Sequence, residues 1–192
     1  IGDWSSDVCS SDLNLSNKWD IRYLELAKHI SSWSKDPSSK IGAVAIGDKG
    51  QVLAQGYNGF PRNIVDRADR LQDREEKYNY IVHAEMNVIY NASYNGVSLD
   101  NSTLYVYGLP VCKSCSLGVV QVGISRVVMP HQEISDRWLE SWIQSRRIFK
   151  EAGVKWDFVK YDGYNQSDIK YTKRSEEHTS ELQSPMYLVC RL

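Results

Sequence analysis

The fold is decided by one stretch, Thr103-Leu-Tyr-Val-Tyr-Gly-Leu-Pro-Val-Cys-Lys-Ser-Cys-Ser-Leu-Gly-Val-Val-Gln-Val-Gly-Ile-Ser-Arg-Val-Val-Met129. Residues 103–107 are β-branched and aromatic, which favours a strand, and Gly108 and Pro110 end it. The sequence then predicts a helix from near Cys112 to about Val122. A second strand follows over 126–129. A strand, a helix and a strand in this order predict two parallel strands in one sheet.

The rest of the fold is predicted by working outward from that stretch. Periodicity and turn signals predict a helix over 19–33, a hairpin of strands over 41–46 and 52–56, helices over 83–94 and 138–152, and a last strand over 155–160. Gly153 fits the C′ position that ends a helix. We therefore expect an α/β fold of three layers, α/β/α, built around a five-stranded mixed sheet.

One connection is longer than the others. Residues 57–80 are rich in charge and are predicted to be irregular. A connection of this length in one domain is usually functional or partly disordered. Its arginines, Arg67, Arg70 and Arg74, alternate with carboxylates, which indicates a solvated helix face or a subunit contact.

The two ends of the chain are predicted to be foreign to the domain. One codon choice for Arg174 to Leu182 has a reverse complement that encodes Ser5 to Leu13 in a shifted frame. Two ends of one gene have no biological reason to be reverse complements, whereas translated sequencing-library adapter would show this relation. We therefore expect residues 1–13 and 174–192 to be adapter-derived scars. The remaining segment, 14–173, has the length of one ordinary domain.

Removing the predicted scars changes the charge and the cysteine count. The chain has a formal net charge of −1, and those ends carry six carboxylates against two arginines, which leaves about +3 for the domain. This charge is too weak to argue for nucleic acid as a partner.

Two of the four cysteines are removed as well. The remaining C-x-x-C indicates intracellular metal or redox chemistry. No apolar run is long enough to span a membrane, so we expect a cytoplasmic protein.

Two short motifs carry the chemistry: His83-Ala84-Glu85 and Cys112-Lys113-Ser114-Cys115. One histidine and two cysteines suit a tetrahedral zinc ion that keeps an open fourth position. Glu85 is not needed as a ligand, and it is placed to move protons for a water at that position. Alone, a C-x-x-C is equally consistent with a redox or structural zinc site, and a lone histidine with packing. The combination at two predicted helix starts favours zinc-assisted hydrolysis.

These motifs resemble a known family. The pattern H-x-E followed by P-C-x-x-C is the known signature of zinc-dependent nucleobase deaminases, and residues 19–160 resemble the cytidine and deoxycytidylate deaminase superfamily. Three segments are similar to deoxycytidylate deaminases in particular: 34–44, 56–62 and 77–85. The resemblance implies a cytidine-deaminase-like fold, one Zn²⁺ on His83, Cys112 and Cys115, and Glu85 as the proton shuttle.

The same resemblance implies a substrate and its contacts. The substrate would be dCMP, and the products would be dUMP, a precursor of thymidylate, and ammonia. Asn58 would meet the sugar hydroxyl, and the Ala84 backbone N–H would meet the pyrimidine carbonyl. Ser34, Lys40 and Arg62 lie in the matching loops, and their side chains could contact a phosphate.

Assembly and regulation are also implied by the family. Many members are homo-oligomers, often hexamers, that dCTP activates and dTTP inhibits, so a Mg²⁺-nucleotide effector is a further expectation.

The chain departs from the family at two places. Val111 stands between Pro110 and Cys112, which affects the wall of the base pocket. Asn63 stands where the family often has glycine, and asparagine tolerates a positive φ better than most residues.

Two other functions remain open from the sequence. The first is another deaminase of the superfamily, acting on tRNA adenosine or on a free nucleoside or nucleobase. It predicts a basic groove beside the zinc. The second is a non-catalytic, zinc-stabilised binding module, which would keep the three ligands but would not need Glu85.

Overall fold

The computed structural model describes residues 18–160. The predicted scars, 1–13 and 174–192, lie outside the described residues. The elements are, in chain order, α1 (Lys18–Ser31), β1 (Gly42–Ile46), β2 (Val52–Tyr57), α2 (Ala68–Gln72), α3 (Arg74–Tyr80), α4 (Ala84–Tyr94), β3 (Thr103–Tyr107), α5 (Lys113–Gln121), β4 (Arg126–Pro130), α6 (Asp136–Ala152) and β5 (Lys155–Val159). Every element predicted from periodicity is present, with ends that differ by one or two residues. Within 18–160 no helix has the length and apolar content needed to cross a membrane.

The sheet is mixed, as predicted. Its five strands have the order β2-β1-β3-β4-β5. β1 pairs antiparallel with both β2 and β3, whereas β3, β4 and β5 are parallel neighbours. The parallel half is the part of the chain where strands and helices alternate, because a parallel strand needs a crossover that a helix supplies.

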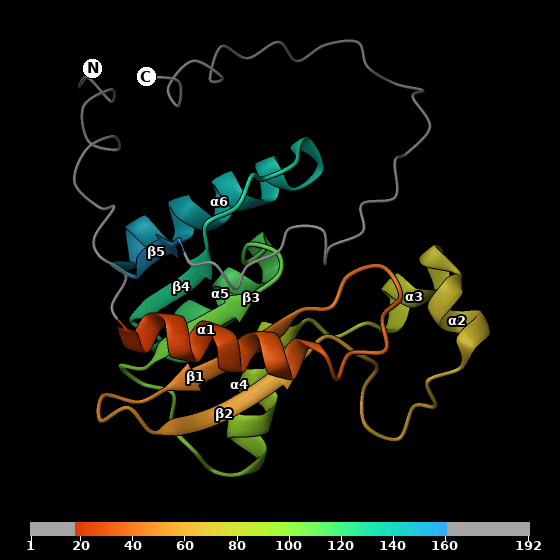
Figure 1. Ribbon diagram of the computed structural model, residues 1–192, viewed down its shortest axis with the longest axis horizontal. Helices are drawn as coiled ribbons and strands as arrows, with labels where there is room; N and C mark the ends of the chain where they lie inside the picture. Colours follow the sequence, from red (N-terminus) through yellow and green to blue (C-terminus); the bar gives the residue numbers. More distant parts are fainter. Residues whose placement is uncertain (1–17, 161–192) are drawn as a thin grey trace.

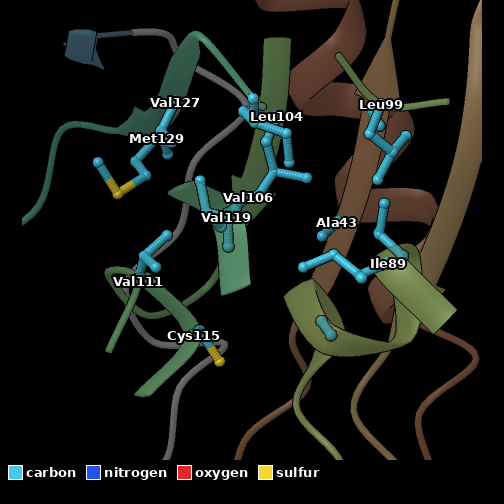
Figure 2. Close-up of a cluster of buried hydrophobic side chains, with 14 of the residues drawn as sticks. Ala43, Ile89, Leu99, Leu104, Val106, Val111, Cys115, Val119, Val127 and Met129 are labelled. Atoms are coloured by element: carbon cyan, nitrogen blue, oxygen red, sulfur yellow. The ribbon is translucent and has the colours of Figure 1, made fainter. Parts of the chain in front are cut away.

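Helices cover both faces of the sheet (Figure 1). Successive strand residues point to opposite faces, so β1 sends Val44 and Ile46 toward α1, and Ala43 and Ala45 toward the other helices. The larger cluster lies on that second face, between the sheet and α4, α5 and α6. Figure 2 shows Cys115 at the margin of this cluster, near Val111. The three-layer α/β/α prediction is confirmed.

Glycine allows α4 to approach the sheet closely. A Cβ atom on Gly56 of β2 would lie 2.6 Å from the backbone N of Val88 and 2.7 Å from the carbonyl O of Ala84. Both atoms belong to α4, and real Cβ contacts of this kind are almost never so short. The first turn of α4 is therefore fixed against β2 by backbone packing.

The prediction that 57–80 is irregular was wrong in its second half. Residues 68–72 and 74–80 form α2 and α3, which project from one side of the sheet (Figure 1). Asp73 is the N-cap of α3, and its side chain accepts a hydrogen bond from the backbone N–H of Glu76. Helices this short are marginal by themselves, so contacts outside the segment must stabilise them, and periodicity over five or seven residues gives no clear signal.

Candidate active site and metal centre

The two sequence motifs lie at the starts of two helices. His83 is the N-cap of α4 and Cys112 is the N-cap of α5. Both residues have extended backbone, and neither side chain caps its own helix. An N-cap side chain normally satisfies a free N–H of its helix, so these two side chains are left available for other contacts. Cys115 lies in the first turn of α5, on the side where an N-cap side chain reaches.

The three candidate ligands converge. The Nδ1 atom of His83 lies 3.4 Å from the Sγ atom of Cys112 and 3.4 Å from the Sγ atom of Cys115. All three atoms lie within 4.8 Å of one another. Typical zinc bond lengths and a tetrahedral angle require about 3.6 Å between a nitrogen and a sulfur ligand. The donor set and its spacing therefore fit a zinc ion with three protein ligands and one open position.

The electrostatics of this cluster favour a thiolate. Hydrogen bonding from Cys115, helped by His83, lowers the pKa of Cys112 to about 4. The same contact with Cys112 raises the pKa of His83 to about 9. The hydrogen bond that the Cys115 thiol donates to Cys112, together with burial, raises the pKa of Cys115 above its usual value. Thiolate is the form of cysteine that binds zinc, and the site stabilises it at Cys112.

Glu85 lies beside the cluster and is 4% exposed. Burial raises the pKa of its carboxyl to about 7, and the nearby His83 offsets only part of that effect. A group that takes up and gives back a proton at neutral pH works best with a pKa in this range. The burial and the raised pKa of Glu85 are the properties that a proton-transfer group in this cavity would need.

The cluster opens into a cavity of about 200 Å³. Its walls come from four parts of the fold: the starts of α4 and α5 (His83, Ala84, Glu85, Cys112), the loop after α1 (Asp36, Pro37, Ser38, Ser39), the α2–α3 segment (Leu71, Gln72, Arg74, Lys77, Tyr78) and the start of α6 (Arg137, Trp138), with Ile41, Asn58, Ile81, Leu109 and Pro110 between them. The long connection over residues 57–80, called the insertion below, therefore forms one wall of the site.

A buried polar network ties that wall to the rest of the protein. The Nζ atom of Lys77 on α3 lies 3.0 Å from Oδ1 of Asp36, and each side chain is 6% exposed. Asp36 also accepts hydrogen bonds from the backbone N–H groups of Ser38 and Ser39. Asn58 donates to the Ser39 carbonyl at 2.8 Å and accepts from the Ile41 N–H at 2.8 Å. The network fixes the orientation of Asn58 and holds α3 in place.

The structure brings only some of the predicted site residues into the cavity. His83, Ala84, Glu85, Cys112 and Asn58 line it, and Cys115 completes the ligand cluster behind them.

The three predicted phosphate contacts lie elsewhere. Ser34 is buried and donates its hydroxyl hydrogen bond to the Asn58 carbonyl, while Lys40 is exposed outside the cavity wall. Arg62 donates to the Asn91 side chain and lies over the Tyr94 ring.

Sequence reasoning missed the cations that do face the cavity. Two of them, Arg74 and Lys77, occupy positions i and i+3 of α3. Tyr78 follows at i+4, so all three side chains share one helix face. That spacing was a usable signal once α3 was known to be a helix. Arg137 had no comparable signal, because it lies in the first turn of a different helix, α6, far along the chain.

Both departures from the family pattern have a structural explanation. Val111 is fully buried, and its carbonyl accepts a hydrogen bond from Ser145 at 2.8 Å. It packs into the core, while Leu109, Pro110 and Cys112 face the cavity. Asn63 has φ of 67°, so the conformation that a glycine would favour is kept by asparagine.

Comparisons with known proteins agree with this fold and this cluster. Residues 17–131 match the model of the cytidine and deoxycytidylate deaminase zinc-binding region. An uncharacterized deaminase in the luxG 3′ region of Aliivibrio fischeri is 36% identical over 148 residues, which cover 76% of this chain and 97% of that protein. Deoxycytidylate deaminase of Mus musculus is 31% identical over 154 residues, covering 78% of this chain and 84% of the relative.

A solved structure supports the fold independently. The dCMP deaminase of cyanophage S-TIM5, in apo form, is 22% identical and has a TM-score of 0.57, covering 74% of this chain and 96% of that one. Fold and site thus define a zinc-binding α/β domain of the deaminase type. The chain belongs to the cytidine and deoxycytidylate deaminase family. The resemblance drawn from the sequence is confirmed, and so is the fold class.

Proposed function

We propose that this protein deaminates dCMP to dUMP, using water and releasing ammonia. One observation carries the proposal: Glu85 is not part of the three-ligand cluster, yet it is buried in the same cavity that His83 and Cys112 line. A non-catalytic zinc module has no use for a buried carboxyl there. The relatives named deoxycytidylate deaminase support dCMP as the substrate.

Each step of the reaction has a residue suited to it. Zinc held by His83, Cys112 and Cys115 would supply Lewis acidity that lowers the pKa of a water to about 7. The Glu85 carboxylate takes a proton from the water that attacks C4 of the pyrimidine, and delivers it to the ring nitrogen N3. Glu85 then takes the proton from the new hydroxyl on C4 and passes it to the amine on the same carbon. The C–N bond breaks, ammonia leaves, and a ring carbonyl remains.

Two further groups suit the substrate. Ala84 is the first residue of α4, so its N–H has no acceptor one turn earlier in the helix and can donate to the pyrimidine carbonyl. The Oδ1 atom of Asn58 accepts from the Ile41 N–H, and an amide oxygen has two lone pairs. The second lone pair can accept a hydrogen bond from the sugar hydroxyl.

Ammonia release by the purified chain tests the substrate. The assay uses dCMP, deoxycytidine, CMP and dCTP, each with and without a chelator. We expect dCMP to be deaminated fastest and the chelator to abolish activity. Absence of ammonia with all four substrates would refute the proposal, and equal rates with deoxycytidine and dCMP would reassign the substrate to the nucleoside.

The Glu85→Gln variant tests the proton shuttle. An amide keeps the shape of the side chain but cannot accept the proton, so turnover should fall by at least about 10²–10⁴-fold. Zinc content, measured by atomic absorption, should stay at that of the parent because Glu85 is not a ligand. Glu25→Gln, an exposed change on α1, is the matched control and should keep full activity. Near-normal ammonia release by Glu85→Gln would exclude the mechanism.

Assembly, regulation and location rest on the family resemblance. The proposal includes a homo-oligomer, dCTP and dTTP as effectors with Mg²⁺ on the nucleotide, a domain spanning 14–173, and a cytoplasmic location. Sedimentation of the purified chain and assays with added dCTP or dTTP test the first two.

A further inference from the structure

The cavity has positive charge that its own residues do not neutralise. Three cations line it: Arg74, Lys77 and Arg137. Lys77 forms the buried ion pair with Asp36. In the described part of the chain, neither arginine forms an ion pair with a carboxylate, whereas Arg67, Arg70 and Arg126 all do. Two guanidinium groups therefore remain available on the same cavity.

Tyr78 links these two arginines on the wall of the cavity. The Nη2 atom of Arg137 donates to the Tyr78 hydroxyl at 2.7 Å. The Arg74 guanidinium lies 5.6 Å from the centre of the Tyr78 ring. Arg74 comes from α3 and Arg137 from α6, so two separate elements bring charge to one place. Because the Tyr78 oxygen accepts from Arg137, its own O–H is free to donate to an anion.

Both arginines are exposed, whereas the candidate zinc ligands are buried or partly buried. An arginine fork matches the geometry of phosphate oxygens and can bind two of them at once. A ligand that extends from the buried Glu85 to these exposed arginines would carry an anionic group at the end that meets the arginines.

We infer that Arg74 and Arg137, joined through the Tyr78 hydroxyl, bind the 5′-phosphate monoester of the nucleotide substrate. The inference rests on the proposed function and adds the residues that decide between nucleotide and nucleoside. It replaces the loop residues Lys40 and Arg62, which lie outside the cavity wall, as the principal phosphate contacts.

The buried pair of Lys77 and Asp36 gives this receptor its position. Lys77 lies one turn after Arg74 and directly before Tyr78, so the ion pair fixes the face of α3 that carries both residues. Lys77 itself is committed to Asp36 and to the Ser38 hydroxyl at 3.1 Å. It is therefore a positioning residue and does not contact the phosphate.

The test compares dCMP with deoxycytidine in the full chain. Arg74→Gln and Arg137→Gln should each lower kcat/KM for dCMP by about 10- to 100-fold and leave kcat/KM for deoxycytidine at the parent value. Tyr78→Phe keeps the ring, removes the hydroxyl, and should lower the dCMP value by a smaller factor. Arg67→Gln, on the same insertion but outside this cavity, is the matched control and should keep the parent ratio of dCMP to deoxycytidine.

Direct binding separates this inference from the proposed function. Titration calorimetry with dCMP and deoxycytidine needs no turnover. If no substrate is deaminated but dCMP binds and loses affinity in Arg74→Gln and Arg137→Gln, the proposed reaction fails and the phosphate site stands.

The measurements can also overturn the inference. Equal losses for dCMP and deoxycytidine would mean a structural role for the arginines, and unchanged dCMP kinetics would mean no role. Inorganic phosphate should inhibit the parent competitively against dCMP. The arginine substitutions could instead weaken inhibition by phosphate and leave the dCMP kinetics normal. That result would assign the site to free phosphate and refute its assignment to the 5′-phosphate of the nucleotide. A dCMP-specific loss in Arg62→Gln with none in Arg74→Gln would also refute it.

Discussion

Replacing Lys77 by methionine should weaken the wall of the active site. The change removes one partner of an ion pair whose atoms are 3.0 Å apart and whose side chains are each 6% exposed. Breaking a buried pair leaves the other charge uncompensated and costs about 3–5 kcal/mol. Asp36 keeps hydrogen bonds from the backbone N–H groups of Ser38 and Ser39, at 2.7 and 3.2 Å. We therefore expect the lower end, about 3 kcal/mol.

Thermal unfolding followed by circular dichroism measures this loss. For a chain of this size, about 3 kcal/mol corresponds to a fall in Tm of about 6–12 °C. Zinc content should be unchanged, because the three ligands come from α4 and α5, while kcat/KM for dCMP should fall because α3 loses its attachment. The double variant Lys77→Met with Asp36→Asn also removes the uncompensated carboxylate, and should therefore recover part of the lost Tm.

The matched control is Lys35→Met. Lys35 pairs with Asp66 at 2.8 Å, but its side chain is 68% exposed. Exposed pairs contribute little, so Tm should hardly change. A fall in Tm for Lys77→Met no greater than that for Lys35→Met would refute the reasoning that burial makes the Asp36 pair important.

The remaining predictions concern the metal and the packing of α4. Cys115→Ser should lower bound zinc to well below one ion per chain by atomic absorption, and should make Tm insensitive to a chelator that lowers the Tm of the parent; full zinc occupancy would contradict the assigned ligand. Gly56→Ala places a Cβ 2.6 Å from the Val88 backbone N, so α4 must shift, and both Tm and zinc affinity should fall. Gly59→Ala meets only two side-chain atoms of Tyr57, at 3.5 and 3.8 Å, and serves as the control; equal behaviour of the two variants would show that α4 tolerates displacement.

Most of the fold could be predicted because its signals are local. β3 was predicted with the same bounds that it has, 103–107, since β-branched and aromatic residues bounded by glycine and proline favour a strand. Gly153 has φ of 74° at the end of α6, as a predicted C′ glycine should. The α2–α3 segment was missed because such short helices depend on partners elsewhere, above all the pair of Lys77 and Asp36.

The candidate site, like the fold, could be predicted from the sequence only in part. His83, Glu85, Cys112 and Cys115 could be identified from residue type and spacing, because zinc chemistry requires those side chains and helix starts bring them close. The far wall of the cavity could not be identified. The loop cations chosen from the resemblance lie outside it, and Arg74 and Arg137 meet only when α3 and α6 are brought together.

The sequence by itself predicted the three candidate metal ligands, the carboxyl that we propose for proton transfer and the three-layer order, because side-chain chemistry and periodicity are properties of short segments. Only the tertiary structure decided which positive charges face the cavity. Arg70, Arg74 and Lys77 lie close together in the sequence of the insertion. Their surroundings differ because folding pairs Lys77 with Asp36 and Arg70 with Glu76. Within residues 18–160 Arg74 has no carboxylate partner, so the role that we propose for it depends on which charges the fold neutralises.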